Sequence, residues 1–434
     1  MISFIHLADI HFTKESGDPY DLDADIRQEL INDIRVHAKT TIDSFDSILI
    51  CGDIAFSAKK EEYEEAKNFL KEICEVLSIP ESSVFCVPGN HDVDQSLTKS
   101  STSVTLLQGQ LEFAETQAVF DTRYAKYSRS QHDISVLYSP INNYNNFFAN
   151  HYECSISFDE PFKNISLPIN EKYNLSLSTI NSTLISSHMD HADKTNERLM
   201  RIPLSQIPSN KGKNTINLTL CHHPPECWVD NDNILQNKLN VRAQIQLYGH
   251  KHTQSIIYKN EYIIINSGAT HPERSGDWQP RYNWITIDII NKDNKPTLEL
   301  KVYPRIWDVE TNSKFISDTI IDGKNNYVKY YIDLSDTSNS QSNYYKGQTN
   351  IDKIQLENNL DIISGVSRKK FTYDFFSLSP VKRNHILNQL GLIKDEDDGK
   401  GDTEIYKELI SRAKEANKIE EFWINIKKYK QREY

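Results

Sequence analysis

The feature that most constrains the fold of this chain is an alternation of strand-like and helix-like segments in its first ninety residues. Apolar, β-branched runs at residues 2–7, 46–50 and 83–87 are typical of buried strands. They alternate with two segments, 22–38 and 59–77, whose apolar residues recur at helical spacing. Strands connected through helices run parallel, with right-handed crossovers. The pattern therefore predicts an α/β domain.

Strand signals return after residue 173, in the runs YNLSLSTIN, TINLTLC, AQIQLY, SIIY, YIIIN, NWITIDI and LELKVYPRI. Short strands joined by turns favour a second sheet packed on the first. We therefore expect a two-sheet α/β sandwich of the αββα type. Residues 95–165 are rich in Ser, Gln and Asn, with scattered helical stretches, and we predict that they form a helical insertion.

The length of 434 residues exceeds one typical core and predicts more than one domain. We assign the α/β pattern to residues 1–310. Residues 333–350 are poor in aliphatic side chains and rich in Ser, Asn and Asp, which is typical of a linker. Helix-like segments follow within residues 351–434 and predict a small all-α domain.

Polar clusters follow the strand-like runs at the points where the strands end. Such strand exits are where α/β sheets bind their ligands. Glycines beside several clusters allow the backbone to approach closely. The candidate metal ligands in these clusters are Asp9, His11, Asp53, Asn90, His222, His250 and His252.

The chemistry of this ligand set favours two divalent cations. Mixed oxygen and nitrogen donors suit Mn²⁺, Fe or Zn²⁺ better than Ca²⁺ or a thiolate zinc site. We expect Mn²⁺, with Fe or Zn²⁺ as alternatives. Ions bridged by a carboxylate lie about 3.5–4 Å apart, a separation suited to in-line displacement at phosphorus. The predicted sets are Asp9, His11 and His252 for one ion, Asn90, His222 and His250 for the other, and Asp53 as the bridge.

Two further residues in the stretch VPGNHDVD carry predicted catalytic roles. His91 follows the candidate ligand Asn90 and cannot easily reach the same ion. We predict that it protonates the departing oxygen or binds a phosphate oxygen. Asp92 is expected to orient the His91 ring, as carboxylates often do for catalytic imidazoles.

The segment 268–283 follows the last ligand cluster and offers two candidate substrate-binding residues. His271 and Arg274 could reach the site and bind a phosphate group. A solvent-exposed hairpin loop is the alternative interpretation of this segment.

The motifs DIH, GD, GNHD, HHPP and GHKH, in this order, resemble the five blocks of the calcineurin-like metallophosphoesterase family. The resemblance covers residues 1–305. It implies ligand roles for the seven residues named above and makes His91 the catalytic imidazole. In CHHPP the family pattern places the ligand directly after the strand, which favours His222 over His223. The long stretch between Asp92 and His222 is unlike the family pattern, so the resemblance does not identify the substrate.

These observations predict a two-metal phosphoesterase that hydrolyses phosphodiester bonds in nucleotides or nucleic acid. Metal-activated hydroxide would attack phosphorus, with His91 assisting. A phosphomonoesterase or protein phosphatase is one alternative. A nucleotide-sensing module that recruits a partner through its C-terminal helices is another. The net charge of −12 argues against a protein that coats nucleic acid non-specifically.

The C-terminal helical segments are similar to the death-like, effector-associated adaptor domains of bacterial conflict systems. The similarity lies in SPVKRNHILNQLGL and ISRAKEANKIEEFW, with the acidic stretch KDEDDGKGD between them. It implies a protein partner for residues 351–434 and a role in anti-phage defence.

The cysteine pattern and the N-terminus predict a cytoplasmic protein that does not bind membranes. The six cysteines show no paired framework, and reduced, buried thiols explain them best. No apolar run approaches the roughly 20 residues of a membrane helix. The opening MISFIHLADI lacks the features of a signal peptide.

Overall fold

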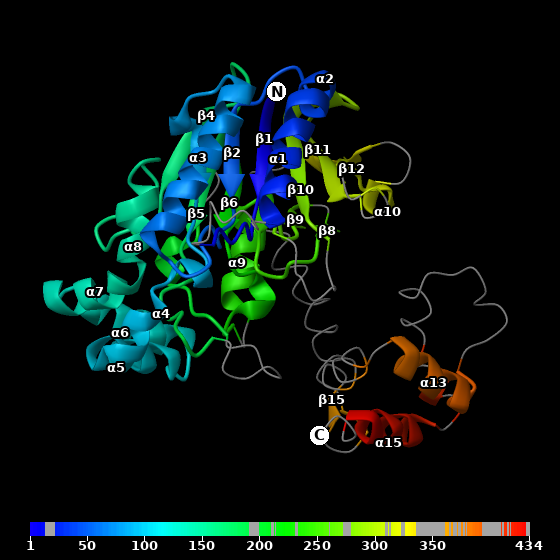
Figure 1. Ribbon diagram of the computed structural model, residues 1–434. Coiled ribbons are helices and arrows are strands. Elements are labelled where there is room, and N and C mark those ends of the chain that lie inside the picture. Colours follow the sequence, from blue (N-terminus) through cyan, green and yellow to red (C-terminus); the bar gives the residue numbers. More distant parts are fainter. Residues whose placement is uncertain are drawn as a thin grey trace. The chain divides into compact units, whose positions relative to one another are not determined.

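The computed structural model divides into two compact units, Met1–Thr337 and Ser338–Tyr434, which we name the N-terminal and C-terminal units (Figure 1). The structure describes residues 1–13, 22–190, 199–209, 212, 214–230, 233–259, 261–271, 279–308, 311, 314–322, 326–335, 361–363, 366–367, 371, 375, 378, 380–392, 409, 412–414, 416 and 418–430.

The first sheet of the N-terminal unit contains the strands predicted near the N-terminus. Its order is β12-β11-β10-β1-β2-β3, and β13 also pairs with β11. Strands β1, β2 and β3 run parallel, whereas β10 pairs antiparallel with β1. The bounds are β1 Ile2–Leu7, β2 Ser47–Ile50, β3 Val84–Cys86, β10 Arg281–Lys292, β11 Lys295–Trp307, β12 Phe315–Ser317 and β13 Val328–Asp333.

The second sheet is built from the strands that follow the insertion. Its order is β4-β5-β6-β7-β9-β8, with β5, β6, β7 and β9 parallel to one another. The bounds are β4 Asn164–Pro168, β5 Asn174–Ile180, β6 Thr215–Cys221, β7 Ile245–Tyr248, β8 Ser255–Tyr258 and β9 Ile263–Asn266. The predicted two-sheet sandwich is confirmed. The later strands β10 and β11 differ from the prediction, because they join the first sheet instead of the second.

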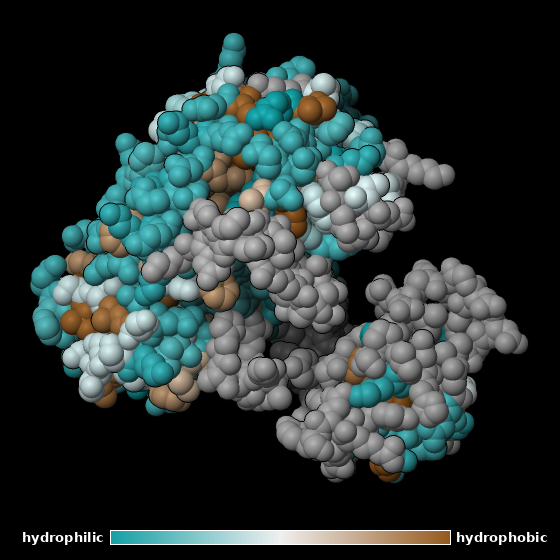
Figure 2. Space-filling model, in the orientation of Figure 1, coloured by the Kyte–Doolittle hydropathy of each residue, from teal (hydrophilic) through white to brown (hydrophobic). Residues whose placement is uncertain are grey.

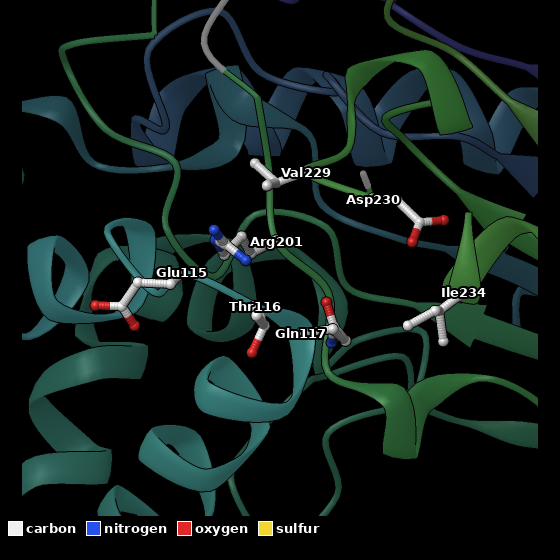
Figure 3. Close-up of a pocket in the computed structure, with 7 residues that line it drawn as sticks. All are labelled: Glu115, Thr116, Gln117, Arg201, Val229, Asp230 and Ile234. Atoms are coloured by element: carbon white, nitrogen blue, oxygen red, sulfur yellow. The ribbon is translucent and has the colours of Figure 1, made fainter. Parts of the chain in front are cut away.

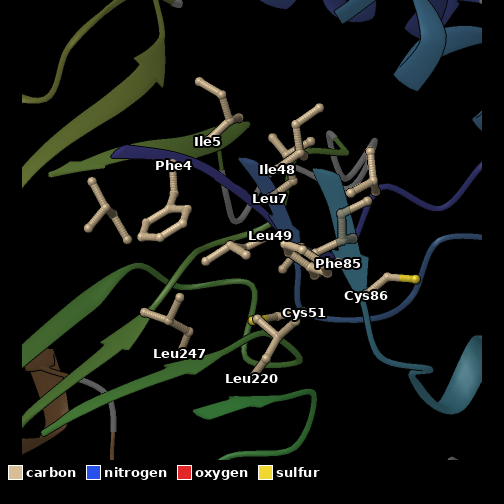
Figure 4. Close-up of a cluster of buried hydrophobic side chains, with 14 of the residues drawn as sticks. Phe4, Ile5, Leu7, Ile48, Leu49, Cys51, Phe85, Cys86, Leu220 and Leu247 are labelled. Atoms are coloured by element: carbon tan, nitrogen blue, oxygen red, sulfur yellow. The ribbon is translucent and has the colours of Figure 1, made fainter. Parts of the chain in front are cut away.

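Apolar side chains from both sheets form one core between them. Phe4 and Leu49 of the first sheet and Leu220 and Leu247 of the second belong to the same buried cluster (Figure 4). Helices α1 (Leu22–Asp33) and α3 (Lys60–Leu77) lie over the first sheet in Figure 1. Both bury apolar residues in this cluster, which explains their periodic sequence patterns. Helix α1 continues through a π-helical turn, Ile34–Ala38, into α2, Lys39–Thr41.

The insertion is helical, as predicted, and has an apolar cluster of its own. This cluster joins Phe120 and Leu137 of the insertion to Leu184 and Met200 of the following segment. The insertion therefore packs on residues that follow the second sheet's strand β5. Its helices are α4 Gln95–Ser100, α5 Thr102–Glu112, α6 Gln117–Tyr127, α7 Gln131–Tyr138 and α8 Asn142–Tyr144, followed by a π-helical turn at Asn145–Ala149.

Two further α-helices of the N-terminal unit are α9, Ile234–Arg242, and α10, Thr319–Asp322. The unit extends beyond residue 310, because β12 and β13 complete the first sheet. In the predicted linker 333–350, β13 ends at Asp333 and residues 336–350 lie outside the described residues. The surface seen in Figure 2 is mainly hydrophilic, with scattered apolar side chains.

The described part of the C-terminal unit has its own small core. Helix α13, Pro380–Leu390, and helix α15, Ile419–Lys430, contribute Leu387 and Phe422 to one buried cluster. Helices α13 and α15 match two of the predicted helical segments, and most of the third segment, 403–418, lies outside the described residues. The structure adds a short hairpin of β14, Asp361–Ile363, and β15, Val366–Ser367. Among the described residues of the whole chain, no helix is long and apolar enough to cross a membrane.

Candidate metal centre

The seven predicted ligands converge because the two sheets present the ends of parallel strands to each other. Asp9, Asp53 and Asn90 follow β1, β2 and β3, which are neighbours in the first sheet. His222 and His250 follow β6 and β7, which are neighbours in the second sheet. The loops are joined by backbone hydrogen bonds, including Asp9 N to the Gly52 carbonyl at 3.1 Å. One strand-exit cluster alone would supply too few donors, whereas the facing sheets supply a complete set.

Asp9, His11 and His252 form the first group of candidate ligands. Each can offer one donor atom, and these atoms lie within 4.8 Å of one another. The Nε2 atom of His252 is 3.3 Å from Oδ1 of Asp9. The backbone N–H of His250 donates to both carboxylate oxygens of Asp9, at 3.1 and 3.0 Å, and fixes its orientation. The structure thus brings together the three residues predicted for one ion.

Asn90, His222 and His250 form the second group of candidate ligands. The Asn90 Oδ1 atom lies 3.0 Å from His222 Nε2 and 3.0 Å from His250 Nδ1. The Nδ1 atom of His222 lies 2.7 Å from the carbonyl oxygen of Cys51. Because a carbonyl only accepts hydrogen bonds, Nδ1 carries the hydrogen and Nε2 is left available for a metal.

Asp53 lies between the two ligand groups. Its Oδ2 atom is 3.8 Å from His11 Nε2 on one side and 3.4 Å from His222 Nε2 on the other. Its Oδ1 atom accepts the backbone N–H of His91 at 2.8 Å. One carboxylate oxygen therefore faces a ligand from each group, which is the placement that a bridging ligand requires.

The backbone at this centre is held in a conformation that ordinary residues rarely adopt. Five of the seven candidate ligands have positive φ values. Such left-handed conformations are uncommon for residues other than glycine, and they concentrate at functional sites. The five residues, with φ between 51° and 68°, are Asp9, His11, Asp53, His250 and His252.

Asp92 differs from its predicted role. Its buried carboxylate does not orient His91. The ring of His91 bonds instead through Nδ1 to the carbonyl oxygen of Phe56, at 2.8 Å. The Asp92 carboxylate ties the loop after β2 to the loop after β3 by accepting hydrogen bonds from the backbone N–H groups of Ile54 (3.2 Å), Ala55 (3.0 Å) and Gly89 (2.9 Å) and from the Tyr63 hydroxyl (3.1 Å).

Of the two predicted substrate-binding residues, the structure describes only His271, which lies beside the centre. The His271 ring lies 5.8 Å from the His11 ring, at the edge of the first ligand group. Its Nδ1 atom is 3.4 Å from the carboxylate of Asp23, at the start of α1. Arg274 lies outside the described residues. The sequence pattern did not indicate that Asp23 lies beside His271. The available signal was an acidic residue in the first turn of helix α1.

His223 is not among the predicted ligands, because the family pattern favours His222, yet its ring also borders the centre. Its ring centroid lies 4.4 Å from that of His250. Its Nδ1 atom is 2.8 Å from the Ser182 hydroxyl, and its buried Nε2 atom has no hydrogen-bond partner among the described residues. The doubled histidine in HHPP was the available signal for a second imidazole here.

The charges of the centre fit divalent cations. Asp9 and Asp53 are both buried, and donor atoms from the two carboxylates lie within 4.8 Å of each other. Burial opposes ionisation, yet the neighbouring histidines hold the pKa of both carboxyls below the usual value. Burial likewise opposes protonation of His222, but Asp53 and Asp9 raise its pKa to about 9. A cation bound at Nε2 would replace the proton that these carboxylates hold there. Two buried, ionised carboxylates require positive charge between them.

An unpaired nitrogen gives a second reason to place a cation here. The buried Nδ1 atom of His11 has no hydrogen-bond partner among the described residues. Burial lowers the pKa of His11 to about 3, so its imidazole is neutral, the form that binds metals. The residues present therefore fit a divalent metal centre.

A separate small cavity lies away from this centre and contains none of the candidate ligands (Figure 3). Its volume is about 30 Å³, enough for one or two water molecules and too small for a substrate. It is lined by Glu115, Thr116, Gln117, Arg201, Val229, Asp230 and Ile234.

Comparison with known proteins matches both parts of the chain. A relative is the uncharacterized metallophosphoesterase-like protein YydB of Bacillus subtilis (strain 168), 25% identical over 321 residues. The match covers 71% of this chain and 60% of YydB, so the chain spans less than two thirds of that relative. A family model named GTPase-associated adaptor domain matches residues 368–428, in agreement with the adaptor resemblance of the C-terminal segments.

Solved structures with a similar course of the chain have low sequence identity. Vacuolar Protein Sorting 29 from Cryptosporidium parvum is 10% identical, with 76% of this chain and 98% of that chain covered and a TM-score of 0.32. GAP50 of Plasmodium is 11% identical, with 79% of this chain and 94% of that chain covered and a TM-score of 0.38. The family model for calcineurin-like phosphoesterases matches residues 2–254, more than half of the chain. The chain belongs to the calcineurin-like phosphoesterase family.

Proposed function

We propose that this chain is a metal-dependent phosphodiesterase that acts on a nucleotide or nucleic-acid substrate with two divalent cations, Mn²⁺ in the first instance. The observation that carries the proposal is the placement of Asp53 between the two ligand groups. With Asp9, His11 and His252 on one side and Asn90, His222 and His250 on the other, each ion would have a protein ligand set that shares one carboxylate.

The residues of the centre contribute charge and orientation. When bound, divalent cations supply an activated water at neutral pH and neutralise charge that develops on phosphate oxygens. Asp9 is fixed by the His250 N–H, and His222 is fixed by the Cys51 carbonyl. These contacts hold the donors in place before substrate binds and reduce the reorganisation that binding requires.

His91 supports a substrate with a poor leaving group, such as a nucleotide diester, in this proposal. The Phe56 carbonyl accepts from its Nδ1, so Nδ1 carries a hydrogen and Nε2 is the atom that exchanges a proton with substrate. The ring is half-buried and lies 4.6 Å from the His11 ring, beside the first ligand group. An alkoxide leaving group, as in a nucleotide diester, needs such a proton donor.

Replacement of His91 by Ala tests this role through the leaving group. For a diester with an alkyl leaving group, kcat should fall by about 100-fold or more, because general acid catalysis contributes about that much. For p-nitrophenolate, which departs without protonation, the loss should be much smaller. Steady-state kinetics across a series of leaving groups measures the difference.

His132→Ala is the matched control, because this exposed histidine lies in α7, outside the centre. It should leave kcat unchanged for every leaving group. An equal loss for all leaving groups in His91→Ala would contradict the leaving-group role and favour binding of a phosphate oxygen.

The C-terminal unit is proposed to recruit a protein partner. The matching family model is named for an association with GTPases, and a GTPase is the first partner to test. We further propose a cytoplasmic effector in bacterial anti-phage defence. The adaptor match and the six buried cysteines, none of which forms a disulfide, support this assignment.

Removal of residues 338–434 should leave phosphodiester hydrolysis unchanged. The apolar cluster of α13 and α15 is separate from the core between the two sheets. The N-terminal unit should therefore fold and keep its kcat and KM. Kinetics of residues 1–337 beside the full chain measures this, and a loss of turnover with a folded protein would show that the C-terminal unit completes the active enzyme.

A further inference from the structure

We propose that Phe56 is an aromatic platform that binds a planar group, such as a nucleobase, on the leaving-group side of the substrate. This inference rests on the proposed phosphodiesterase function and specifies its substrate class. It assigns a role to a residue that is neither a candidate ligand nor a predicted proton donor.

Phe56 is a large apolar side chain exposed at the centre itself. It is 48% exposed. Its ring lies 5.2 Å from the His91 ring, tilted by 34°, and 6.1 Å from the His11 ring. Single exposed apolar residues are common on protein surfaces and need no explanation. An exposed aromatic ring beside both the proposed proton donor and a candidate ligand is available to a substrate bound at the centre.

The ring is carried by a firmly held loop. The Phe56 N–H donates to the Phe12 carbonyl at 2.9 Å, and the Phe56 carbonyl accepts from His91. The segment that follows Phe56 is held by the Glu62 carboxylate, which accepts hydrogen bonds from the N–H groups of Ser57 and Lys59, each at 2.9 Å. A ring on a fixed backbone loses little conformational freedom when a ligand packs on it. The exposed ring is therefore organised before binding.

The position of the ring indicates which part of the substrate it meets. His91 is proposed to protonate the departing oxygen, so the leaving group must lie on the His91 side of the centre. Phe56 packs on that side. Aromatic rings stack on any base because every base has a flat π face. A leaving group with a planar base would gain this contact, whereas a small alkyl group would not.

The experiment compares adenosine 5′-monophosphate with ribose 5-phosphate, which has the same sugar and phosphate but no base. Both are used as ligands of the Mn²⁺-loaded full chain, measured by calorimetry and as inhibitors of bis-aryl phosphate hydrolysis. The wild type should bind the adenosine compound about tenfold more tightly, the effect of one stacked base. Phe56→Ala should remove this preference and leave ribose 5-phosphate binding unchanged.

Phe113→Ala is the matched control, since Phe113 is another exposed phenylalanine, at the end of α5. It should keep the preference for the adenosine compound. Persistence of the preference in Phe56→Ala, or an equal weakening of both ligands, would overturn the platform. Absence of Mn²⁺-dependent turnover in the wild type would instead overturn the proposed function, and the calorimetric comparison would still decide the role of Phe56.

Discussion

Replacement of Asp53 by Asn is expected to lower phosphodiester turnover by about a thousandfold or more, the scale seen when a central catalytic group is removed. The amide has no charge to share between two cations, and its NH₂ group repels them. Its oxygen can still accept the backbone N–H of His91, now made to Asp53 at 2.8 Å. The loop should therefore keep its conformation while metal binding is lost. Turnover and metal content per chain are the two measurements.

Asp94→Asn is the control for this substitution. Asp94 caps α4 by accepting the N–H groups of Ser96 and Leu97, at 3.0 and 3.1 Å, and asparagine caps helices equally well. Turnover and metal content should stay at the wild-type level. Full activity in Asp53→Asn, or an equal loss in Asp94→Asn, would contradict a bridging role for Asp53.

Replacement of Gly52 by Ala is expected to destabilise the N-terminal unit by about 2–4 kcal/mol, since two separate costs add. Gly52 has φ of 82°, a conformation that alanine rarely adopts. An added Cβ would also lie 2.7 Å from Nδ1 of His222 and 2.8 Å from the backbone N of Gly89. Displacement of His222 should reduce metal binding as well. Urea unfolding and metal titration measure the two effects.

Gly109→Ala is the control substitution, and it is expected to stabilise the protein instead of destabilising it. Gly109 lies inside helix α5, and an added Cβ would meet no atom within 4 Å. Alanine should stabilise this helix by about 0.5–1 kcal/mol. If Gly52→Ala were as mild as Gly109→Ala, the close packing of the strand-exit loops around His222 would be refuted.

The strand–helix alternation made the first three strands predictable, because each local pattern agrees with the final fold. The strand with which another strand pairs is harder to predict, because the two can lie far apart in the sequence. Ile2 of β1 pairs with Ile287 of β10, across most of the N-terminal unit. The apolar pattern of β10 is the same whichever sheet it joins. The sequence therefore predicted the strand but not its sheet.

The convergence of the seven candidate ligands could be predicted, because each lies within four residues of the end of a strand, where chain position determines location. The structural role of Asp92 could not be predicted in this way. Its hydrogen-bond partners Ile54 and Ala55 belong to another loop, 38 and 37 positions away along the chain. Adjacency to His91 suggested a side-chain contact that the fold does not make. The exposure of Phe56 likewise depends on how the loops pack, which a local pattern does not contain.

Hydrolysis of a bis-aryl phosphate and a mono-aryl phosphate, before and after Mn²⁺ is restored to chelated protein, tests the central claim most directly. We predict no turnover after chelation, recovery with Mn²⁺ and faster hydrolysis of the diester. Turnover that persists after chelation would contradict the metal centre, and so would its absence with every divalent metal supplied. Faster hydrolysis of the monoester would contradict the proposed diester preference.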